Sequence, residues 1–158
     1  MPNSEPSQYS YKVKAQLSLN QRAELREKYV PLLFSLGRRY LPEFDFSKGA
    51  PLRYEFLDVI RTGWLLDKNT DRPDYADIVW AVGYAFGLLL EDKFGMTWCL
   101  IEDHMGESIS MIKFQSNPDS TYKEVSIAPF NYVAKRKELQ NAEVFADGMR
   151  EFEKIIAK

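Results

Sequence analysis

A chain of 158 residues has the length of one ordinary domain, and its 45% hydrophobic and 14% aromatic content excludes an intrinsically disordered protein. A net charge of −2 excludes the basic footprint of a nucleic-acid binder, and one cysteine excludes an internal disulfide. The polar start Met1–Ser7 lacks the apolar run of a secretion signal or membrane anchor. We therefore expect a cytoplasmic domain with no nucleic-acid or membrane partner and no cofactor.

The charge is unevenly distributed along the chain. Residues 51–110 carry eleven acidic and five basic side chains, whereas residues 1–50 carry an excess of three positive charges. This pattern predicts an acidic surface formed by the middle of the chain.

The N-terminal stretch has a mixed signal. Residues 1–16 are rich in Pro, Ser, Asn and Gln, which is typical of a loosely ordered terminus. The alternation of Tyr9, Tyr11 and Val13 also allows a short edge strand. We place the structured domain at residues 17–158.

Three helices are predicted in the first 95 residues. Ser18, with Gln21 three residues later, fits a capping box for a helix over about 19–41, and Pro31 inside it predicts a kink or an interruption. A second helix is expected to start at Pro51, with Arg53, Glu55, Asp58 and Arg61 mostly on its polar face.

The third predicted helix, about 73–94, is apolar on almost all sides and should be the central helix of the fold. Asp71, Pro73 and Asp74 supply its start signal. Gly83 and Gly87 lie one turn apart inside it, so we interpret them as a site of close packing. They do not lie between a strand and a helix, and no nucleotide site is implied.

After Gly95 the apolar period changes from helical to alternating, which predicts three strands: 96–103, 108–115 and 122–128. Turn chemistry at 104–107 and 116–120 joins them into an antiparallel meander. Residues 130–138 are expected to form a short helix or turn. Asn141 is a candidate cap for a last amphipathic helix over about 142–157.

Together these elements predict an α+β fold, in which the N-terminal helices and the C-terminal helix pack on one face of a short antiparallel sheet. The other face of the sheet is expected to be left for solvent or a partner.

Residues 78–138 resemble an uncharacterised bacterial family, known only as a domain of unknown function. The resemblance rests on the residues Gly83-Tyr84-Ala85-Phe86-Gly87, Gly95-Met96-Thr97-Trp98, Glu102-Asp103 before Gly106, and Pro129 followed by Val133, Lys135 and Arg136. The family brings no activity that can be carried over. What the resemblance implies is a small bacterial binding protein or an immunity protein, which neutralises a toxin made by the same cell.

The best candidate for chemistry is the turn containing Glu102, Asp103, His104 and Glu107. Carboxylates and imidazole can hold a metal or act as a general base, but neighbouring strand residues point to opposite faces, and a solvated turn is the simpler interpretation. His104 is the only histidine and Cys99 the only cysteine, so a Cys/His dyad has one possible composition. We expect Cys99 to be a buried strand residue.

Lys135 and Arg136 are candidate anion-binding residues, or else they pair with the acids at 102–107. Most aromatic side chains fall at inward positions. Trp80 is the exception, because an exposed Trp80 would be a natural anchor for a partner.

Two functional hypotheses follow. The first is a non-enzymatic bacterial immunity protein that covers the basic cleft of a secreted toxin, with acidic contacts at Asp71, Asp74, Asp77, Glu102, Asp103 and Glu107. The second is a small enzyme or ligand-binding domain that uses Glu102, Asp103 and His104 in a pocket under the central helix.

Overall fold

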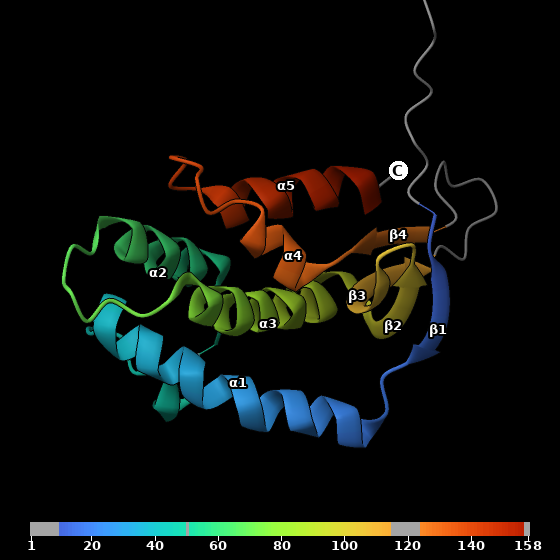
Figure 1. Cartoon of the computed structure of the whole chain (residues 1–158), viewed down its shortest axis with the longest axis horizontal. Helices are drawn as coiled ribbons and strands as arrows, with labels where there is room; N and C mark the ends of the chain where they lie inside the picture. The colour runs from blue at the N-terminus through green and yellow to red at the C-terminus, as the bar shows by residue number, and fades with distance from the viewer. Residues whose placement is uncertain (1–9, 50, 115–123, 157–158) are drawn as a thin grey trace, which may run out of the picture.

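The most apolar stretch of the chain forms the central helix of the fold. In the computed structural model, which describes residues 10–49, 51–114 and 124–156, this helix is α3 (Tyr75–Phe94), and its core positions are completely buried. Figure 1 shows α1 (Leu19–Tyr40) along one side of α3, with α2 (Tyr54–Leu66), α4 (Pro129–Ala134) and α5 (Val144–Ile156) along the other. A short 3₁₀ helix, η1 (Phe46–Lys48), lies between α1 and α2. A helix that is apolar on almost all sides is thus covered along most of its surface, and Trp80 is an exposed exception.

A four-stranded antiparallel sheet lies at the end of the molecule where α3 finishes (Figure 1). Its strands are β1 (Lys12–Gln16), β2 (Thr97–Asp103), β3 (Gly106–Phe114) and β4 (Glu124–Ile127), and their spatial order follows the chain. Trp98 lies opposite Met111 and both belong to the main core with the helices. The α+β fold and the predicted meander are therefore confirmed, and β1 extends the sheet by one strand.

The second face of the sheet is not left open at its centre. Cys99, Ile101 and Ile112 are buried there and form a second apolar cluster, with Tyr11 and Val13 packed against it. The edge strand β1 therefore belongs to the folded domain, which begins before residue 17. Residues 1–9 of the N-terminal segment lie outside the described residues.

Two glycines bring neighbouring elements close to α3, as predicted. A Cβ atom on Gly83 would lie 2.7 Å from a ring carbon of Phe130 at the start of α4. A Cβ atom on Gly87 would overlap the indole ring of Trp98 on β2. Side-chain carbons do not approach this closely in folded proteins, so these positions need glycine for packing.

Several predicted boundaries differ from the structure. Helix α1 starts after the capping box of Ser18 and Gln21 but continues through Pro31 without interruption. Helix α2 starts at Tyr54 instead of Pro51, because Arg53 has extended backbone angles. The turn between β2 and β3 is shorter than predicted, since Gly106, with a φ of 111°, already belongs to β3. The predicted turn at 116–120 lies outside the described residues.

The prediction that Asp58 and Arg61 lie on a polar face of α2 is wrong. Both are buried, with 8% and 1% of their surface exposed. The Asp58 carboxylate accepts hydrogen bonds from the backbone N–H groups of Phe145 and Ala146 at the start of α5, at 2.8 and 3.1 Å. Burial raises the pKa of Asp58 to about 6, against the lowering effect of these bonds.

Arg61 fixes the segment between α4 and α5. Its guanidinium donates to the carbonyl oxygens of Asn141 at 2.9 Å, of Leu139 at 2.6 Å and of Arg136. These carbonyls follow the end of α4, where the backbone has no regular helical partners. Asp58 and Arg61 of α2 thus hold the last part of the chain against the core.

Candidate functional site

The turn between β2 and β3 places the predicted acidic residues in two groups. Glu102 and Glu107 lie directly opposite each other across the two strands, an arrangement in which like charges repel. Lys14 of β1 bridges them, with its Nζ 3.0 Å from the Glu102 carboxylate and 2.8 Å from the Glu107 carboxylate. Glu102 and Glu107 therefore bind Lys14, whereas the sequence analysis suggested Lys135 or Arg136 as the cation.

Asp103 stabilises the turn itself. Its Oδ1 accepts a hydrogen bond of 2.7 Å from the backbone N–H of Met105, as short polar side chains do in tight turns. His104 and Met105 form the tip and are exposed. The turn thus begins directly after Asp103. Asp103 and His104 line the same surface groove, whereas Glu102 lies on β2 beside Lys14.

A groove of about 1050 Å³ runs between this turn and the helices. We call it the turn groove. The large apolar residues that line it, which we call its floor, come from α1, α3, β2, β3 and α4: Tyr29, Trp80, Leu100, Ile109 and Phe130. The turn residues Asp103–Ser108, which we call its turn wall, also line the groove, as do Asn131, Ala134 and Lys135 of the α4 region.

Three aromatic rings give the floor its shape. Trp80 stacks on Tyr29 with ring centres 5.6 Å apart and planes 3° from parallel. Phe130 packs against Trp80 at 5.1 Å and against Tyr29 at 5.8 Å. Tyr29 is buried, but Trp80 keeps 43% of its surface exposed, and Met105 at the lip of the groove keeps 83%. Trp80 is thus exposed, which is the condition that the sequence analysis set for a partner anchor.

The other predicted acidic contacts lie elsewhere. Asp74 is the residue before α3, and Asp77 lies in its first turn, where a negative charge suits the positive end of the helix. Asp71 is paired with Arg39 of α1 at 2.9 Å, and the same guanidinium lies 2.8 Å from Asp67. The pKa of Asp67 is well below its usual range, mainly because its carboxylate accepts a hydrogen bond from the Tyr40 hydroxyl, and also because it accepts one from Asn69.

These ion pairs join the basic first part of the sequence to its acidic middle part. Five of the eleven acidic residues in the range 51–110 bind a basic residue from the first fifty: Lys14 holds Glu102 and Glu107, Arg22 holds Glu91, and Arg39 holds Asp67 and Asp71. The exposed pairs among them stabilise the fold only weakly, whereas the Asp67 side chain is buried. They do reduce the acidic excess that the middle segment offers to a partner.

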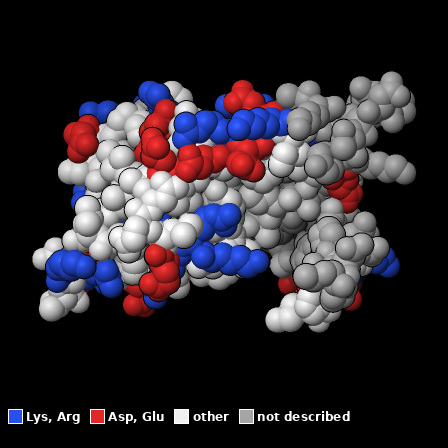
Figure 2. Space-filling view, turned by 90° about the horizontal axis from the view of Figure 1, so that it is seen from above, with Lys and Arg blue, Asp and Glu red and all other residues white. Residues whose placement is uncertain are grey.

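The surface around α5 also mixes the two signs. Seen from the α5 side, basic and acidic side chains lie in neighbouring rows instead of forming one broad patch of a single charge (Figure 2). Arg150 accordingly lies 2.5 Å from Asp147, one turn earlier in the helix. This face has the character of an ordinary solvated surface.

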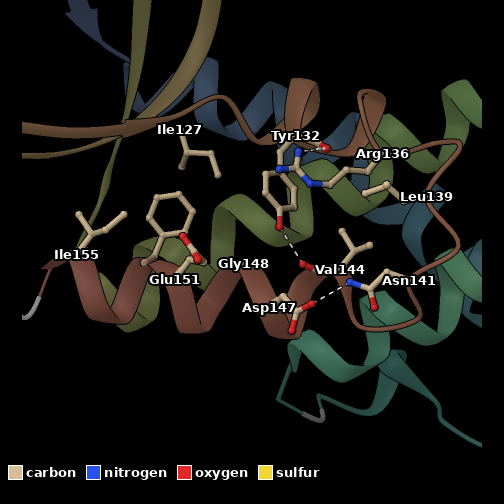
Figure 3. Close-up of a pocket in the computed structure, with 11 residues that line it drawn as sticks. Ile127, Tyr132, Arg136, Leu139, Asn141, Val144, Asp147, Gly148, Glu151 and Ile155 are labelled. Atoms are coloured by element: carbon tan, nitrogen blue, oxygen red, sulfur yellow. Dashed lines mark hydrogen bonds between the residues drawn. The ribbon is translucent and has the colours of Figure 1, made fainter. Parts of the chain in front are cut away.

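The two predicted anion-binding residues line different pockets. Lys135 faces the turn groove, whereas Arg136 lines a smaller pocket of about 370 Å³ between α4, α5 and β4 (Figure 3). There the Arg136 guanidinium lies 3.5 Å from the centre of the Tyr132 ring and donates to the Tyr132 carbonyl at 3.0 Å. The Tyr132 hydroxyl donates to the Val144 carbonyl at 2.8 Å. These groups hold α4 to α5.

The remaining candidates for chemistry are accounted for by packing. Cys99 is buried, as expected, and burial raises the pKa of its thiol, which disfavours the reactive thiolate. Within residues 10–49, 51–114 and 124–156, no three His, Cys, Asp or Glu side chains are grouped so as to hold a metal ion. In the same ranges, no helix has the length and apolar character that a membrane span needs.

Comparison with protein-family models gives no match, and neither does comparison with characterised proteins or with solved structures. The resemblance of residues 78–138 to a bacterial family of unknown function therefore stays a prediction.

Proposed function

We propose that this chain is a protein-binding domain that takes a segment of a partner protein into the turn groove. The observation that carries the proposal is the exposed Trp80 among the apolar residues that line the groove. A half-exposed Trp in such a place supplies a large contact area at low entropic cost, which is typical of residues that dominate binding energy. Met105 at the lip adds a flexible apolar side chain, of the kind that adaptable binding surfaces use.

The state of the polar groups supports binding over catalysis. Glu102 and Glu107 are about half exposed and share Lys14, and Asp103 is bonded to the backbone of its own turn. A general base or nucleophile acts best from a buried position beside the reacting atom. Here the carboxylates already have partners that belong to the fold.

The specific form that we propose is a cytoplasmic bacterial immunity protein that covers the active cleft of a cognate toxin. Its support is the resemblance of residues 78–138 and the acidic wall formed by Asp103 and Glu107, which a basic toxin cleft would complement. Asp71, Asp74 and Asp77 would form a second, peripheral set of contacts beside the start of α3.

The experiment is a pull-down from the source bacterium with the tagged chain as bait and mass spectrometry as the readout. Three baits are compared: wild type, Met105→Gln in the groove lip, and Leu66→Gln as a matched control, since Leu66 is 71% exposed and does not line the turn groove. We expect one stoichiometric protein with wild type and Leu66→Gln, and much less of it with Met105→Gln. Equal recovery with all three baits would contradict the proposal.

A second candidate is a site for a small ligand in the same groove. Two observations favour it: the volume of about 1050 Å³ is close to that of small-molecule sites, and His104 joins Asp103 at one wall. Trp80 is the only exposed one of the three Trp residues, so its fluorescence reports on occupancy. A small molecule that shifts this emission and is displaced by the pull-down partner would place both ligands in one groove.

A further inference from the structure

Strand β4 covers the edge of β3 along only part of its length. It pairs with Met111–Phe114, and the chain then continues into α4. Among the residues that the structure describes, no strand pairs with Gly106–Ile109 on the β4 side. These four residues line the turn groove, and Gly106, Glu107 and Ser108 are exposed. The groove is therefore bordered by an open strand edge.

The backbone groups of Glu107 and Ile109 face this open edge. The Leu17 N–H donates to the Trp98 carbonyl at 2.9 Å, so the backbone groups of Trp98 face β1. Trp98 lies opposite Met111 of β3, whose N–H and C=O groups therefore face away from β2. Alternation along the strand gives Ile109 and Glu107 the same direction. Within the described part of the chain, neither residue has a backbone hydrogen bond to the segment that follows β4.

The side chains beside this edge provide an apolar position. Glu107 and Ile109 are two residues apart on a strand, so their side chains lie on the same face of the sheet. Ile109 packs against the main core and lines the turn groove together with Trp80 and Phe130. A strand that pairs here would place one side chain beside Ile109 and another beside Glu107. The position beside Ile109 therefore suits an apolar residue.

The position beside Glu107 suits a basic residue. The Glu107 side chain is 51% exposed, and although it binds Lys14, a carboxylate accepts more than one donor. Asp103 lines the groove as well, so its charged lining has two carboxylates against the ammonium group of Lys135. Opposite charges across two paired strands attract each other.

The outer edge of β1 is less suited to strand addition. Its pairing with β2 contains a bulge between Val13 and Ala15, and its side chains include the exposed Lys12 and Lys14. Bulges and lysines are features that discourage pairing at an edge. The pairing of β2 with β3 has no such irregularity, so the open part of β3 has regular strand geometry beside the groove.

We propose that the partner segment binds in the turn groove as an extended strand that pairs antiparallel with Glu107–Ile109 of β3. It has an apolar residue opposite Ile109 and, two positions later, a basic residue opposite Glu107. Antiparallel pairing continues the arrangement of the sheet and is the more stable kind. The backbone bonds supply affinity and the two side chains supply specificity. This inference rests on the proposed function and defines the conformation and chemistry of the partner segment.

Amide hydrogen exchange of the full chain, followed by NMR, tests the open edge first. The amides of Glu107 and Ile109 should exchange at least roughly tenfold faster than those of Ser108 and Ser110, which face β2. Protection of Glu107 and Ile109 in the free chain would overturn the inference, whether it came from the chain itself or from a second copy.

Four capped synthetic peptides then test the strand. Each has about seven residues, the length of a short strand, and is rich in Thr. The first has Leu at its centre and Lys two positions later, and the second has Glu in place of Lys. The third is the Lys peptide with an N-methyl group on the Leu amide, which faces β3 in the proposed pairing. The fourth has the N-methyl group on the next amide, which faces away. Binding is measured by the anisotropy of the labelled peptides, at low and at high salt.

Wild type should bind the Lys peptide roughly fivefold more tightly than the Glu peptide, and high salt should reduce the difference. Methylation of the Leu amide should abolish binding, whereas methylation of the next amide should change it by less than about twofold. The bound Lys peptide should protect the amides of Glu107 and Ile109. Glu107→Gln should remove most of the preference for Lys, and Glu153→Gln, the same change at an exposed position on α5, should leave it intact.

The outcomes distinguish this inference from the proposed function. Equal effects of the two methyl groups, or no binding of the Lys peptide, would overturn the extended strand. The proposed function fails in a different experiment, when the pull-down recovers its protein equally with wild type and Met105→Gln. A natural partner that is lost with Met105→Gln, but leaves the Glu107 and Ile109 amides unprotected when bound, would keep the groove and overturn the strand pairing.

Discussion

Replacing Arg61 by Met tests how the segment 136–141, between α4 and α5, is held to the core. The substitution keeps an apolar stem of similar length but removes the guanidinium, which donates to three backbone carbonyls in the segment 136–141. A hydrogen bond from a charged donor contributes roughly 1.5 kcal/mol or more, so three of them give about 4–5 kcal/mol. Because some of the freed carbonyls can regain water, we expect a loss of about 3 kcal/mol in the free energy of unfolding.

The assay is urea unfolding followed by far-UV circular dichroism, with Arg150→Met as the control. Arg150 is exposed and forms only surface ion pairs, so its loss should cost less than about 0.5 kcal/mol. If Arg61→Met loses less than about 1 kcal/mol, the buried guanidinium does not hold the 136–141 segment, and the reasoning is refuted.

Three further predictions concern other parts of the fold. Gly87→Ala should lower the free energy of unfolding by about 1–3 kcal/mol, because the new methyl group meets the Trp98 ring; a gain in melting temperature would show that this contact is looser than described. Ser18→Ala removes the side-chain acceptor of the Gln21 N–H and should cost about 1 kcal/mol, measured by urea unfolding, whereas an unchanged value would show that water replaces the cap. The pKa of Asp58 is raised to about 6 from an ordinary value of 3.8, so the folded state binds the proton more tightly than the unfolded state. The free energy of unfolding of wild type should therefore fall relative to that of Asp58→Asn as the pH rises from 4 to 6, and the two should run parallel above pH 7. A relative gain for wild type between pH 4 and 6 would mean that the hydrogen bonds from α5 outweigh burial.

The elements that could be predicted from the sequence are those with local signals. The capping box at Ser18, the αL glycine Gly95 and the change of apolar period after it each act within a few residues, and each is found in the structure. The close packing at Gly83 and Gly87 could also be predicted, because two glycines one turn apart leave a smooth helix face.

What could not be predicted depends on contacts between distant residues. The sequence pattern predicted Asp58 and Arg61 to be surface residues of an amphipathic helix, but their partners lie more than seventy positions later in the chain. The acidic excess of the middle segment read as a partner surface, but Lys14 and Arg39 neutralise part of it. A buried polar residue is recognisable only when its partner is known.

Part of the candidate site could be predicted from the sequence. The acids of the 102–107 turn and Trp80 were singled out, but as separate features. The turn groove combines Tyr29 from α1, Trp80 from α3, the turn itself and Phe130 from α4, and only the fold brings these segments together. Sequence spacing also gave no reason to separate Lys135 from Arg136, which follow each other at the end of α4 and line different pockets.

The most direct test of the turn groove as a binding site is photo-crosslinking in living cells. A photoreactive phenylalanine analogue is placed at position 105, at the lip of the groove, or at position 66, which is similarly exposed on α2. We expect one defined protein adduct from position 105 and none from position 66. An adduct from position 66 alone, or the same adducts from both positions, would contradict the assignment of the groove as the binding site.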